Sequence, residues 1–342
     1  MPKKVLLKLL ANKKPLTDFN FKQIKSVLIR PIGYGLGDAI LLTAVLKQLK
    51  QAYPDIRTGV FAINRNAPVF NNNPFVDEVL QDKPLTYLLN RGKWQVFMDY
   101  VPTFTTKNIF CDFLLKPQHT ICFEKTAKKH YSHKTVKNYD FYVPDLAKTH
   151  LSRSLTLTPF KDYVNTANVQ YTLPPLPKES ENKAKSFLRK NALNILVCPK
   201  GSDRIIKPEE TEKILTQIKK TIKKEINFIF PYSKETVSFK NINICFTGAL
   251  DIYTFFALVK NAGLVLSIDS APVHAACAYK VPVLGLYSGW QRNFTLFAPL
   301  ANTPHRFVCS VKKIDGHIKI IDGLDTAKAA DFVKELLPLN ML

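Results

Sequence analysis

The feature that most constrains the fold is a regular alternation of short apolar strand patterns with helix patterns from residue 25 onward. The first strand patterns cover 25–30, 59–64 and 94–100. A helix pattern covers 38–53 and ends before Pro54. Residues 103–172 have no steady periodicity, and no elements are predicted there. Alternation of this kind is typical of a parallel α/β sheet.

A proline-rich stretch, TLPPLPKESE at 172–181, interrupts the series and is typical of an interdomain linker. Further strand patterns follow at 193–199, 226–231, 263–269 and 281–287, with helix patterns at 181–190, 208–224, 251–261, 271–279 and 326–337. We therefore expect two Rossmann-like domains, residues 1–173 with a basic extension 1–24, and residues 174–342. The last helix is a candidate to pack back on the first domain. A ligand is expected in a cleft between the domains, at the carboxyl ends of the strands.

The chain is strongly basic, with 49 Lys and Arg against 27 Asp and Glu, a net charge of +22. Such an excess favours an anionic partner without choosing among nucleic acid, lipid and phosphorylated ligands. The six cysteines are scattered with no CxxC pair, as reduced core residues of a cytosolic protein are. The sequence has no apolar run long enough to span a bilayer. The start, MPKKVLLKLLANKK, predicts a basic amphipathic helix, either an ordinary surface helix or one in contact with an anionic membrane.

A glycine turn with one acid joins the first strand to its helix. Gly33, Gly35 and Gly37 precede Asp38 in IRPIGYGLGDAILLT. The dinucleotide fingerprint and the P-loop are both excluded, because neither spacing fits and no Gly-Lys-Ser/Thr follows. Asp38 at a helix start is stabilised as an anion and is a candidate general base. The alternative is a plain N-cap.

The second half contains two helix starts suited to an anion. In SIDSAPVHAACA, a strand delivers Asp269, Ser270 can cap, and His274 falls on the first turn. In CPKGSDRIIKPEE, Ser202 and Lys207 stand before a helix, where Lys207 can place a positive charge on a leaving phosphate. The alternatives are a structural histidine and a solvated surface lysine.

Together these segments, with NPFVDEVL at 73–80 and VPVLGLYSG, resemble glycosyltransferase family 9, the ADP-heptose:lipopolysaccharide heptosyltransferases, over roughly 25–290. The resemblance implies a GT-B fold whose first domain binds the acceptor and whose second binds the nucleotide-sugar. It gives Asp38 the role of general base and Lys207 a contact to donor phosphate. It makes the remaining expected donor-binding residues Ser202, Asp269, Ser270, Ala271 and His274. The sequence departs from the family at Ala271, at Pro208 and at YSGW (287–290), which bears on the identity of the donor.

The resemblance implies inverting transfer of heptose from ADP-heptose to the inner core of lipopolysaccharide, with no cofactor beyond this donor. The chain has no Asp-x-Asp motif, and we expect the reaction to need no metal. The lysine excess fits an anionic acceptor and peripheral association with the cytoplasmic face of the inner membrane. The candidate acceptor contacts are Arg65, Lys125, Lys128, Lys129, Lys134 and Lys137. A solvated loop is the alternative for this lysine run.

Three other functions stay open. A transferase of the same fold could use another nucleotide-sugar or another surface glycan. A basic chain with 11% aromatic residues could bind nucleic acid, although no RNP, KH, zinc-finger or helix-turn-helix signature is present. A family member that has lost activity could bind glycan alone, but Asp38, Lys207 and His274 are retained.

Overall fold

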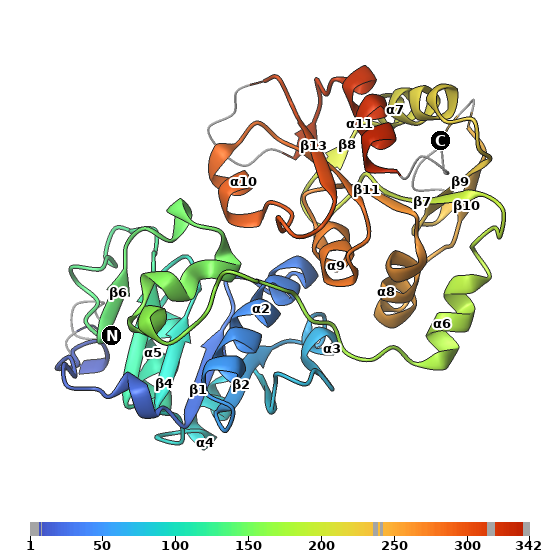
Figure 1. Ribbon diagram of the computed structural model, residues 1–342. Coiled ribbons are helices and arrows are strands. Elements are labelled where there is room, and N and C mark those ends of the chain that lie inside the picture. Colours follow the sequence, from blue (N-terminus) through green and yellow to red (C-terminus); the bar gives the residue numbers. More distant parts are fainter. Residues whose placement is uncertain (1–6, 8, 235–238, 240–241, 313–318, 338–342) are drawn as a thin grey trace. The chain divides into compact units, whose positions relative to one another are not determined.

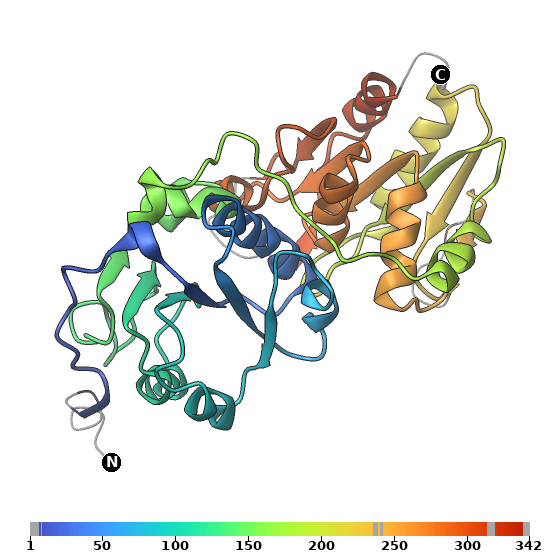
Figure 2. The same ribbon diagram turned by 60° about the horizontal axis from the view of Figure 1, so that its bottom comes forward.

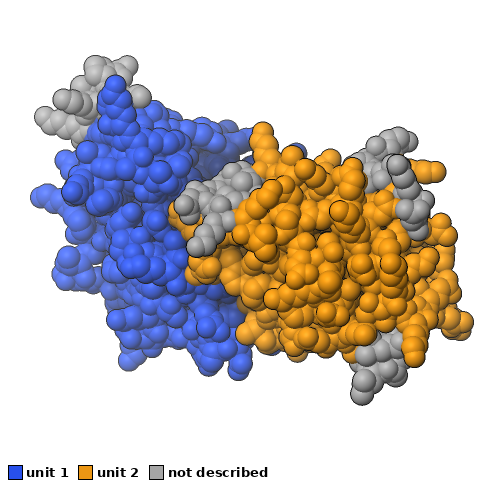
Figure 3. All heavy atoms as spheres, turned by 90° about the horizontal axis from the view of Figure 1, so that it is seen from above, with its two compact units in different colours: residues 1–174 blue, residues 175–342 orange. Residues whose placement is uncertain are grey.

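A computed structural model describes residues 7, 9–234, 239, 242–312 and 319–337. The chain forms two compact units, Met1–Pro174 and Pro175–Leu342 (Figure 1, Figure 3). Each unit is built around a six-stranded sheet in which every neighbouring pair of strands is parallel. The expected pair of Rossmann-like α/β units is therefore confirmed.

Unit 1 contains a sheet of strand order β3-β2-β1-β4-β5-β6. The strands are β1 (Ser26–Arg30), β2 (Arg57–Ala62), β3 (Glu78–Gln81), β4 (Val96–Asp99), β5 (His119–Phe123) and β6 (Phe141–Val143). The helices are α2 (Leu36–Ala52), α3 (Ala67–Phe70), α4 (Pro84–Leu89) and α5 (Thr106–Leu115). Short 3₁₀ helices follow: η1 (Phe21–Gln23) before the sheet, and η2 (Leu146–Lys148), η3 (Leu151–Leu157) and η4 (Pro159–Asp162) after it. Figure 2 shows α2 on one side of this sheet and α4 and α5 on the other.

Unit 2 repeats the same order of connections, β10-β9-β7-β11-β12-β13. Its strands are β7 (Leu193–Cys198), β9 (Ile226–Phe230), β10 (Ile244–Phe246), β11 (Leu264–Ile268), β12 (Val283–Tyr287) and β13 (His305–Cys309). A separate two-stranded ribbon pairs β8 (Ile205–Ile206) with β14 (Ile320–Ile321). The helices are α6 (Lys178–Lys185), α7 (Pro208–Thr221), α8 (Ile252–Asn261), α9 (Ala271–Tyr279), α10 (Gln291–Phe297) and α11 (Thr326–Leu336). Helix α11 packs on α7 and β13 of this unit.

Local chemistry explains where these elements begin and end. All five residues of β1 are buried, as expected of a central strand covered on both faces. Helix α7 has Pro208 in its first turn, acids behind it and lysines in its last turn, which suits the helix dipole. Helix α6 begins at Lys178, inside the predicted linker 172–181. It follows the extended Pro177, and its acids in the first turn and lysines in the last turn suit the helix dipole.

The start of the chain is part of the packing of unit 1. The Lys13 backbone N–H donates to the Lys137 carbonyl (2.8 Å), and the Lys137 N–H donates to the Ala11 carbonyl (2.7 Å). Ala11 is buried with Phe104 and Val136, and Leu7 and Leu10 pack against this cluster. Of the predicted N-terminal helix, residues 1–6 and 8 lie outside the described residues.

The six cysteines are free, as expected for a reduced protein. Cys111, Cys122, Cys198 and Cys277 are buried, but Cys309 is exposed and Cys245 is half-buried. The expectation of six core cysteines is therefore wrong for Cys309, because it ends β13 at the edge of the sheet. Among the described residues, none of the helices has the length and hydropathy that crossing a membrane requires.

Candidate functional site

The strand orders define one favoured ligand position in each unit. In an open parallel sheet, ligands bind beyond the carboxyl ends of the two strands from which the connections run in opposite directions. In unit 1 these strands are β1 and β4, and in unit 2 they are β7 and β11. Asp38 follows β1, Ser202 follows β7, and Asp269 follows β11 directly. The predicted site residues thus belong to the loops and helix starts at these two positions.

The glycine turn holds the carboxylate of Asp38 in place. Helix α2 begins earlier than expected, so Gly35 is its N-cap and Asp38 is its third residue. The Gly35 backbone N–H donates to Oδ2 of Asp38 (3.2 Å). A Cβ on Gly33 would lie 2.3 Å from this oxygen, and one on Gly35 would lie 3.1 Å away. The glycines are therefore needed to leave room for the acid, and Gly37 lies in the same helical turn.

This geometry corrects the N-cap alternative for Asp38. The acid lies at the third position of the helix rather than before it, and its carboxylate accepts the N–H of the N-cap residue Gly35. Its side chain is half-buried. A carboxylate in this place repels an anionic ligand from the start of α2. The same carboxylate is suited to accept a proton from a bound hydroxyl group.

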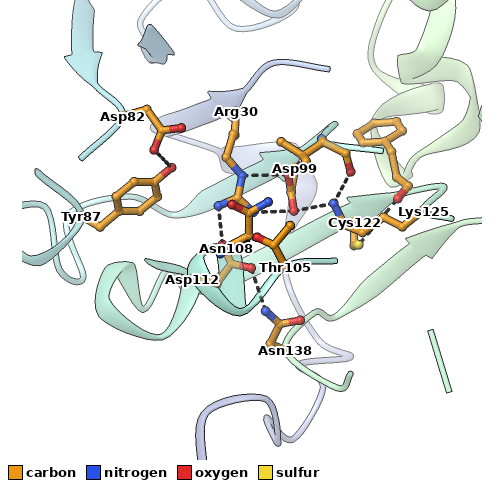
Figure 4. A network of polar contacts seen from close by, with 12 residues as sticks. Arg30, Asp82, Tyr87, Asp99, Thr105, Asn108, Asp112, Cys122, Lys125 and Asn138 are labelled. Atoms are coloured by element: carbon orange, nitrogen blue, oxygen red, sulfur yellow. Dashed lines mark hydrogen bonds and ion pairs between the residues drawn. The ribbon is translucent and has the colours of Figure 1, made fainter. Parts of the chain in front are cut away.

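A buried ionic network lies at the ends of β1 and β4 (Figure 4). Arg30 is 1% exposed and pairs in register with Asp99. Its Nε and Nη2 donate to the two oxygens of Asp99 at 2.9 and 2.6 Å. Nη1 lies 2.8 Å from Oδ1 of Asp112, but the two atoms are not aligned as a hydrogen bond. Sequence reasoning missed this network, because Arg30 and Asp99 look like ordinary strand ends.

The two carboxyl groups of the network differ in pKa for a physical reason. Burial alone would raise the pKa of Asp99, but Arg30 and Lys125 outweigh it and hold the pKa well below its usual range. Burial raises the pKa of Asp112 to about 6 against the pull of Arg30. Asp112 receives the less favourable contact, because Arg30 gives the fork of its guanidinium to Asp99. Asn138 donates to Oδ2 of Asp112 at 2.7 Å.

Lys125 belongs to this network, which sets it apart from the other predicted acceptor lysines. Its Nζ lies 2.7 Å from Oδ2 of Asp99, and its side chain is 2% exposed. It also donates to the carbonyl of Val101. The structure therefore assigns Lys125 a structural partner inside unit 1, and we leave it out of the acceptor patch proposed below. The remaining candidates are exposed: Arg65, Lys128, Lys129, Lys134 and Lys137.

In unit 2, helix α9 begins where the sequence predicted. Ser270 is the N-cap residue, but its hydroxyl donates to the carbonyl of Ile268 (3.2 Å) and does not cap the helix. The first turn of α9 contains no acidic residue. Ala271 is half-buried at the first helical position. This helix start keeps its positive dipole end for an anionic ligand.

His274 lies in the buried side of α9 and is 2% exposed. This burial fits the structural alternative for the residue as well as a short-range contact to a ligand at the helix start. Gly201 brings the loop after β7 close to the same place. A Cβ on Gly201 would lie 3.3 Å from the Cβ of Ser270, so glycine lets the two loops approach closely without crowding.

Asp269 is held by two residues that sequence reasoning missed. Arg204 Nη1 lies 2.8 Å from its Oδ2, and the Asn293 amide donates to the same oxygen. Arg204 Nη2 also donates to Asn293 Oδ1 (3.2 Å), which closes a ring of three side chains. Burial raises the pKa of Asp269, and the contacts to Asn293 and Arg204 oppose that rise. Asp269 is thus a buried anchor of the loop after β7 and of α10, with its carboxylate occupied by protein donors.

The second helix start is less suited to an anion than the sequence suggested. Lys207 is the N-cap residue of α7, and the side chains of both Lys207 and Ser202 are exposed. The first turn of α7 carries Glu209 and Glu210, and Glu210 Oε1 accepts the backbone N–H of Leu324 (2.6 Å). Two acids disfavour an anion at this terminus. The contribution that this terminus can still make to a phosphate site is the positive charge of the exposed Lys207 side chain.

The described residues contain no group of three or more His, Cys, Asp or Glu side chains placed to hold a metal ion. A pocket of unit 2 lies elsewhere, at the start of β9, lined by residues that include Arg189, Lys224 and Ile226. It lies at the amino ends of the strands, the edge opposite to the loops that carry Ser202 and Asp269. We therefore place the candidate site at the carboxyl ends and not in this pocket.

Comparison with known proteins gives the geometry its context. Residues 146–313 match the family model described as glycosyltransferase family 9 (heptosyltransferase). The chain is 26% identical over 285 residues to the "Putative lipopolysaccharide heptosyltransferase 4" of Escherichia coli (strain K12), covering 78% of this chain and 75% of that protein.

Solved structures share the fold. A family 9 glycosyltransferase from Veillonella parvula DSM 2008 has a TM-score of 0.72 at 14% identity, covering 91% of this chain and 97% of that one. The E. coli heptosyltransferase WaaC with ADP has a TM-score of 0.62 at 11% identity, covering 91% and 99%. The expected GT-B class is thus confirmed. The family model and the E. coli relative add sequence similarity that fold similarity cannot give, so the sequence resemblance to glycosyltransferase family 9 is confirmed.

Proposed function

We propose that the protein transfers a heptose from ADP-heptose to the inner core of lipopolysaccharide, with inversion at the anomeric carbon. The observation that carries the proposal is the contrast between two helix starts. Helix α2 presents a carboxylate at the switch position of unit 1, and α9 presents an acid-free first turn at that of unit 2. The first suits proton removal from an acceptor hydroxyl, and the second suits a diphosphate leaving group.

In the proposed reaction, Asp38 accepts the proton of the acceptor hydroxyl as its oxygen attacks the anomeric carbon. The bond between that carbon and the diphosphate breaks on the opposite face, and ADP leaves with the electron pair. The N–H groups of the first turn of α9 receive the developing charge, and the exposed amine of Lys207 adds a positive charge. Electrostatic help to a leaving group of this kind contributes about 3 kcal/mol. Ser202, Ser270 and His274 are the proposed additional contacts to the donor.

The direct test pairs wild-type protein with Asp38→Asn against a panel of ADP-, UDP-, GDP- and CMP-sugars. Asparagine keeps the size of the side chain and an oxygen for the Gly35 N–H but removes its basicity. We expect turnover to fall by about 100- to 10,000-fold with unchanged donor affinity. Asp55→Asn, which alters an exposed acid of the same unit, is the matched control. Turnover that survives in Asp38→Asn would contradict the proposed base.

The same panel decides the donor. The sequence departs from the family pattern at Ala271 and Pro208, beside the proposed diphosphate contacts. This favours a second candidate, a transferase of the same mechanism that uses another nucleotide-sugar. Transfer from a UDP-, GDP- or CMP-sugar in preference to ADP-heptose would establish that candidate.

We further propose that the transfer needs no metal ion. Support comes from the lack of a clustered metal-ligand set among the described residues, together with the availability of α9 and Lys207 for the phosphate charge. Turnover should persist in excess chelator. Loss of turnover that magnesium, manganese or iron restores would overturn this part of the proposal.

The proposed acceptor contacts are the exposed lysines of the 124–137 segment, Lys128, Lys129, Lys134 and Lys137, with Arg65. They suit an acceptor that carries phosphate and acidic sugars. Replacing the four lysines by glutamine should raise the acceptor KM and leave the donor KM unchanged. The matched control replaces four exposed lysines of unit 2, Lys213, Lys219, Lys220 and Lys223. An equal change in both variants would reduce the assignment to a general charge effect.

A further inference from the structure

Helices α4 and α5 of unit 1 lie side by side and pack against each other (Figure 2). Both helices also expose large apolar side chains. The exposed fractions are 64% for Leu85, 48% for Leu88, 62% for Leu89, 41% for Phe110 and 41% for Phe113. We call these five residues the α4–α5 patch. Gathered apolar residues on a surface mark a binding face more often than scattered single ones do.

The exposure of these side chains does not result from poor packing of α4 and α5 against the core. The opposite faces of the same two helices are fully packed, with Tyr87, Cys111 and Leu115 buried in one cluster. Tyr87 stacks on Phe61 with the ring centroids 4.1 Å apart. Each helix therefore has an apolar face that packs inward and a second apolar face that points outward. Folding of unit 1 explains the first face only.

Within the two segments that carry the α4–α5 patch, the exposed charged residues all have one sign. The segments 83–93 and 105–116 contain five basic residues, all exposed: Lys83, Arg91, Lys93, Lys107 and Lys116. The acid within these segments, Asp112, and the neighbouring Asp82 have side chains only 10% and 8% exposed. Both are turned into the protein, where Asp112 contacts Arg30 and Asp82 accepts from Tyr87.

One basic residue is fixed against the apolar surface. The guanidinium of Arg91 donates to the carbonyls of Phe113 and Leu114 at 3.0 and 3.1 Å. It also lies over the ring of Phe113, 5.6 Å from the ring centroid. Positive charge is thus built into the patch itself and is not only a feature of its rim.

We propose that the α4–α5 patch docks on an anionic lipid surface. Leucine and phenylalanine side chains enter the boundary between headgroups and acyl chains, while the surrounding lysines and arginine meet lipid phosphates. The charge pattern chooses this occupant. A second copy of the chain would bring five like charges against five, and lipid phosphates complement them. The inference rests on the proposed function in one respect: an acceptor anchored in a membrane explains why the enzyme would need such a face.

The test measures sedimentation of the full-length protein with vesicles of phosphatidylcholine alone or with phosphatidylglycerol. We expect binding to the anionic vesicles only, weakening as salt rises. Leu85→Ser with Leu89→Ser should weaken binding by about tenfold through lost apolar burial. Lys83→Gln with Lys93→Gln should weaken it by roughly 30-fold, about fivefold for each charge. The matched control is Val311→Ser with Ile320→Ser, which removes two exposed apolar side chains of unit 2.

The outcomes separate this proposal from the proposed function. Transfer to a delipidated, soluble acceptor should be the same for wild type, for the leucine double variant and for the lysine double variant. If wild type lacks transferase activity but the leucine variant loses vesicle binding, the docking face stands and the proposed function fails. Leucine-variant binding equal to wild type would overturn the docking face, as would equal losses in the patch and control variants. Self-association that the leucine change abolishes, without vesicle binding, would assign the patch to a second copy instead.

Discussion

Helices α2 and α9 start at comparable positions in two sheets of the same topology, and they treat charge in opposite ways. Helix α2 places Asp38 at its third residue and satisfies its own N-cap N–H with that carboxylate. Helix α9 has no acid in its first turn, and the hydroxyl of its N-cap residue is turned to a strand carbonyl. The same fold thus provides an acid at one helix start and an acid-free first turn at the other. Local sequence at a helix start, and not strand order, makes the difference.

The ends of the central strands, next to the two helix starts, differ as well. In unit 1 the central strand ends carry the charges, with Arg30 paired in register with Asp99. In unit 2 the corresponding register pairs Cys198 with Ser267, which are neutral and small. Its ion pair, Arg204 with Asp269, lies in the loops after the strands. The network of unit 1 holds strand ends together, and the ring of unit 2 holds the loops after its strands together.

The largest effect on the contrast between α2 and α9 is expected from displacing the Asp38 carboxylate while keeping the residue. In Gly33→Ala the new Cβ would lie 2.3 Å from Oδ2, so the short acidic side chain must rotate away. We expect turnover to fall by about 100-fold or more with nearly unchanged thermal stability. Gly35→Ala, with 3.1 Å of space, should cost less. Steady-state kinetics and thermal melts of both variants check this, and equal turnover in the two would contradict the role of Gly33.

Removing Arg30 tests whether the unit 1 network is structural. Arg30→Met leaves Asp99 and Asp112 buried without their shared cation and should lower the free energy of unfolding of unit 1 by about 3–5 kcal/mol. Urea unfolding followed by the fluorescence of Trp94 reports this, in a Trp290→Phe background that leaves one tryptophan. Arg153→Met, at an exposed position, is the control and should change stability by about 0.5 kcal/mol or less. A loss no larger than in the control would rule out a stabilising network.

Asp112 gives unit 1 a pH-dependent contribution to stability, and the strand-end pair Cys198–Ser267 of unit 2 has no carboxyl group beside it in register. The pKa of Asp112 is about 6 in the folded protein and about 3.8 when unperturbed, so the folded state holds the proton more tightly. This contribution to stability is present below pH 4 and lost as the pH rises through 6. Relative to Asp112→Asn, wild-type stability should fall by up to about 3 kcal/mol between pH 4 and 7. Parallel curves for the two proteins over that range would refute the raised pKa.

The smallest expected effect is a loss of donor affinity when α9 is given an acidic residue in its first turn, as α2 has. Ala271→Asp places a carboxylate in the first turn of α9, where it should stabilise the helix slightly and repel a diphosphate. We expect donor affinity to fall by roughly tenfold relative to Ala271→Asn, which has the same size without the charge. Calorimetric titration with the donor measures the difference. Equal affinities would show that the α9 start does not contact the diphosphate.

The elements with strong local signals were predictable from the sequence. Helix α9 has its predicted bounds of 271–279, and β1 differs from its predicted bounds by one residue. Both are marked by local features, an apolar run for β1 and Ser270 followed by Pro272 at the start of α9. The region 103–172 was not predictable, since β6 is three residues long and 3₁₀ helices carry no periodic pattern. Its strand β5 is a run of buried residues without the alternation of a half-exposed strand.

The candidate site was predictable in part. The strand and helix patterns of the sequence place Asp38, Asp269 and Ser270 at strand ends and helix starts. The strand order then assigns them to the switch positions. The partners of Asp269 were not predictable, because Arg204 and Asn293 are 65 and 24 residues away in the chain. Lys125 shows the same limit. It reads as one member of a lysine run, and only the fold reveals that it ends beside Asp99.

The pairing of residues 11–13 with Lys137 has a practical consequence for anyone shortening this chain. A version that begins after Lys13 would lose both backbone hydrogen bonds to Lys137 and the cover that Ala11 gives to Val136. The newly exposed apolar surface and the unpaired backbone groups would then promote aggregation during expression. Poor yield of such a truncated protein would therefore reflect damage to unit 1, and would say nothing about catalysis or lipid attachment.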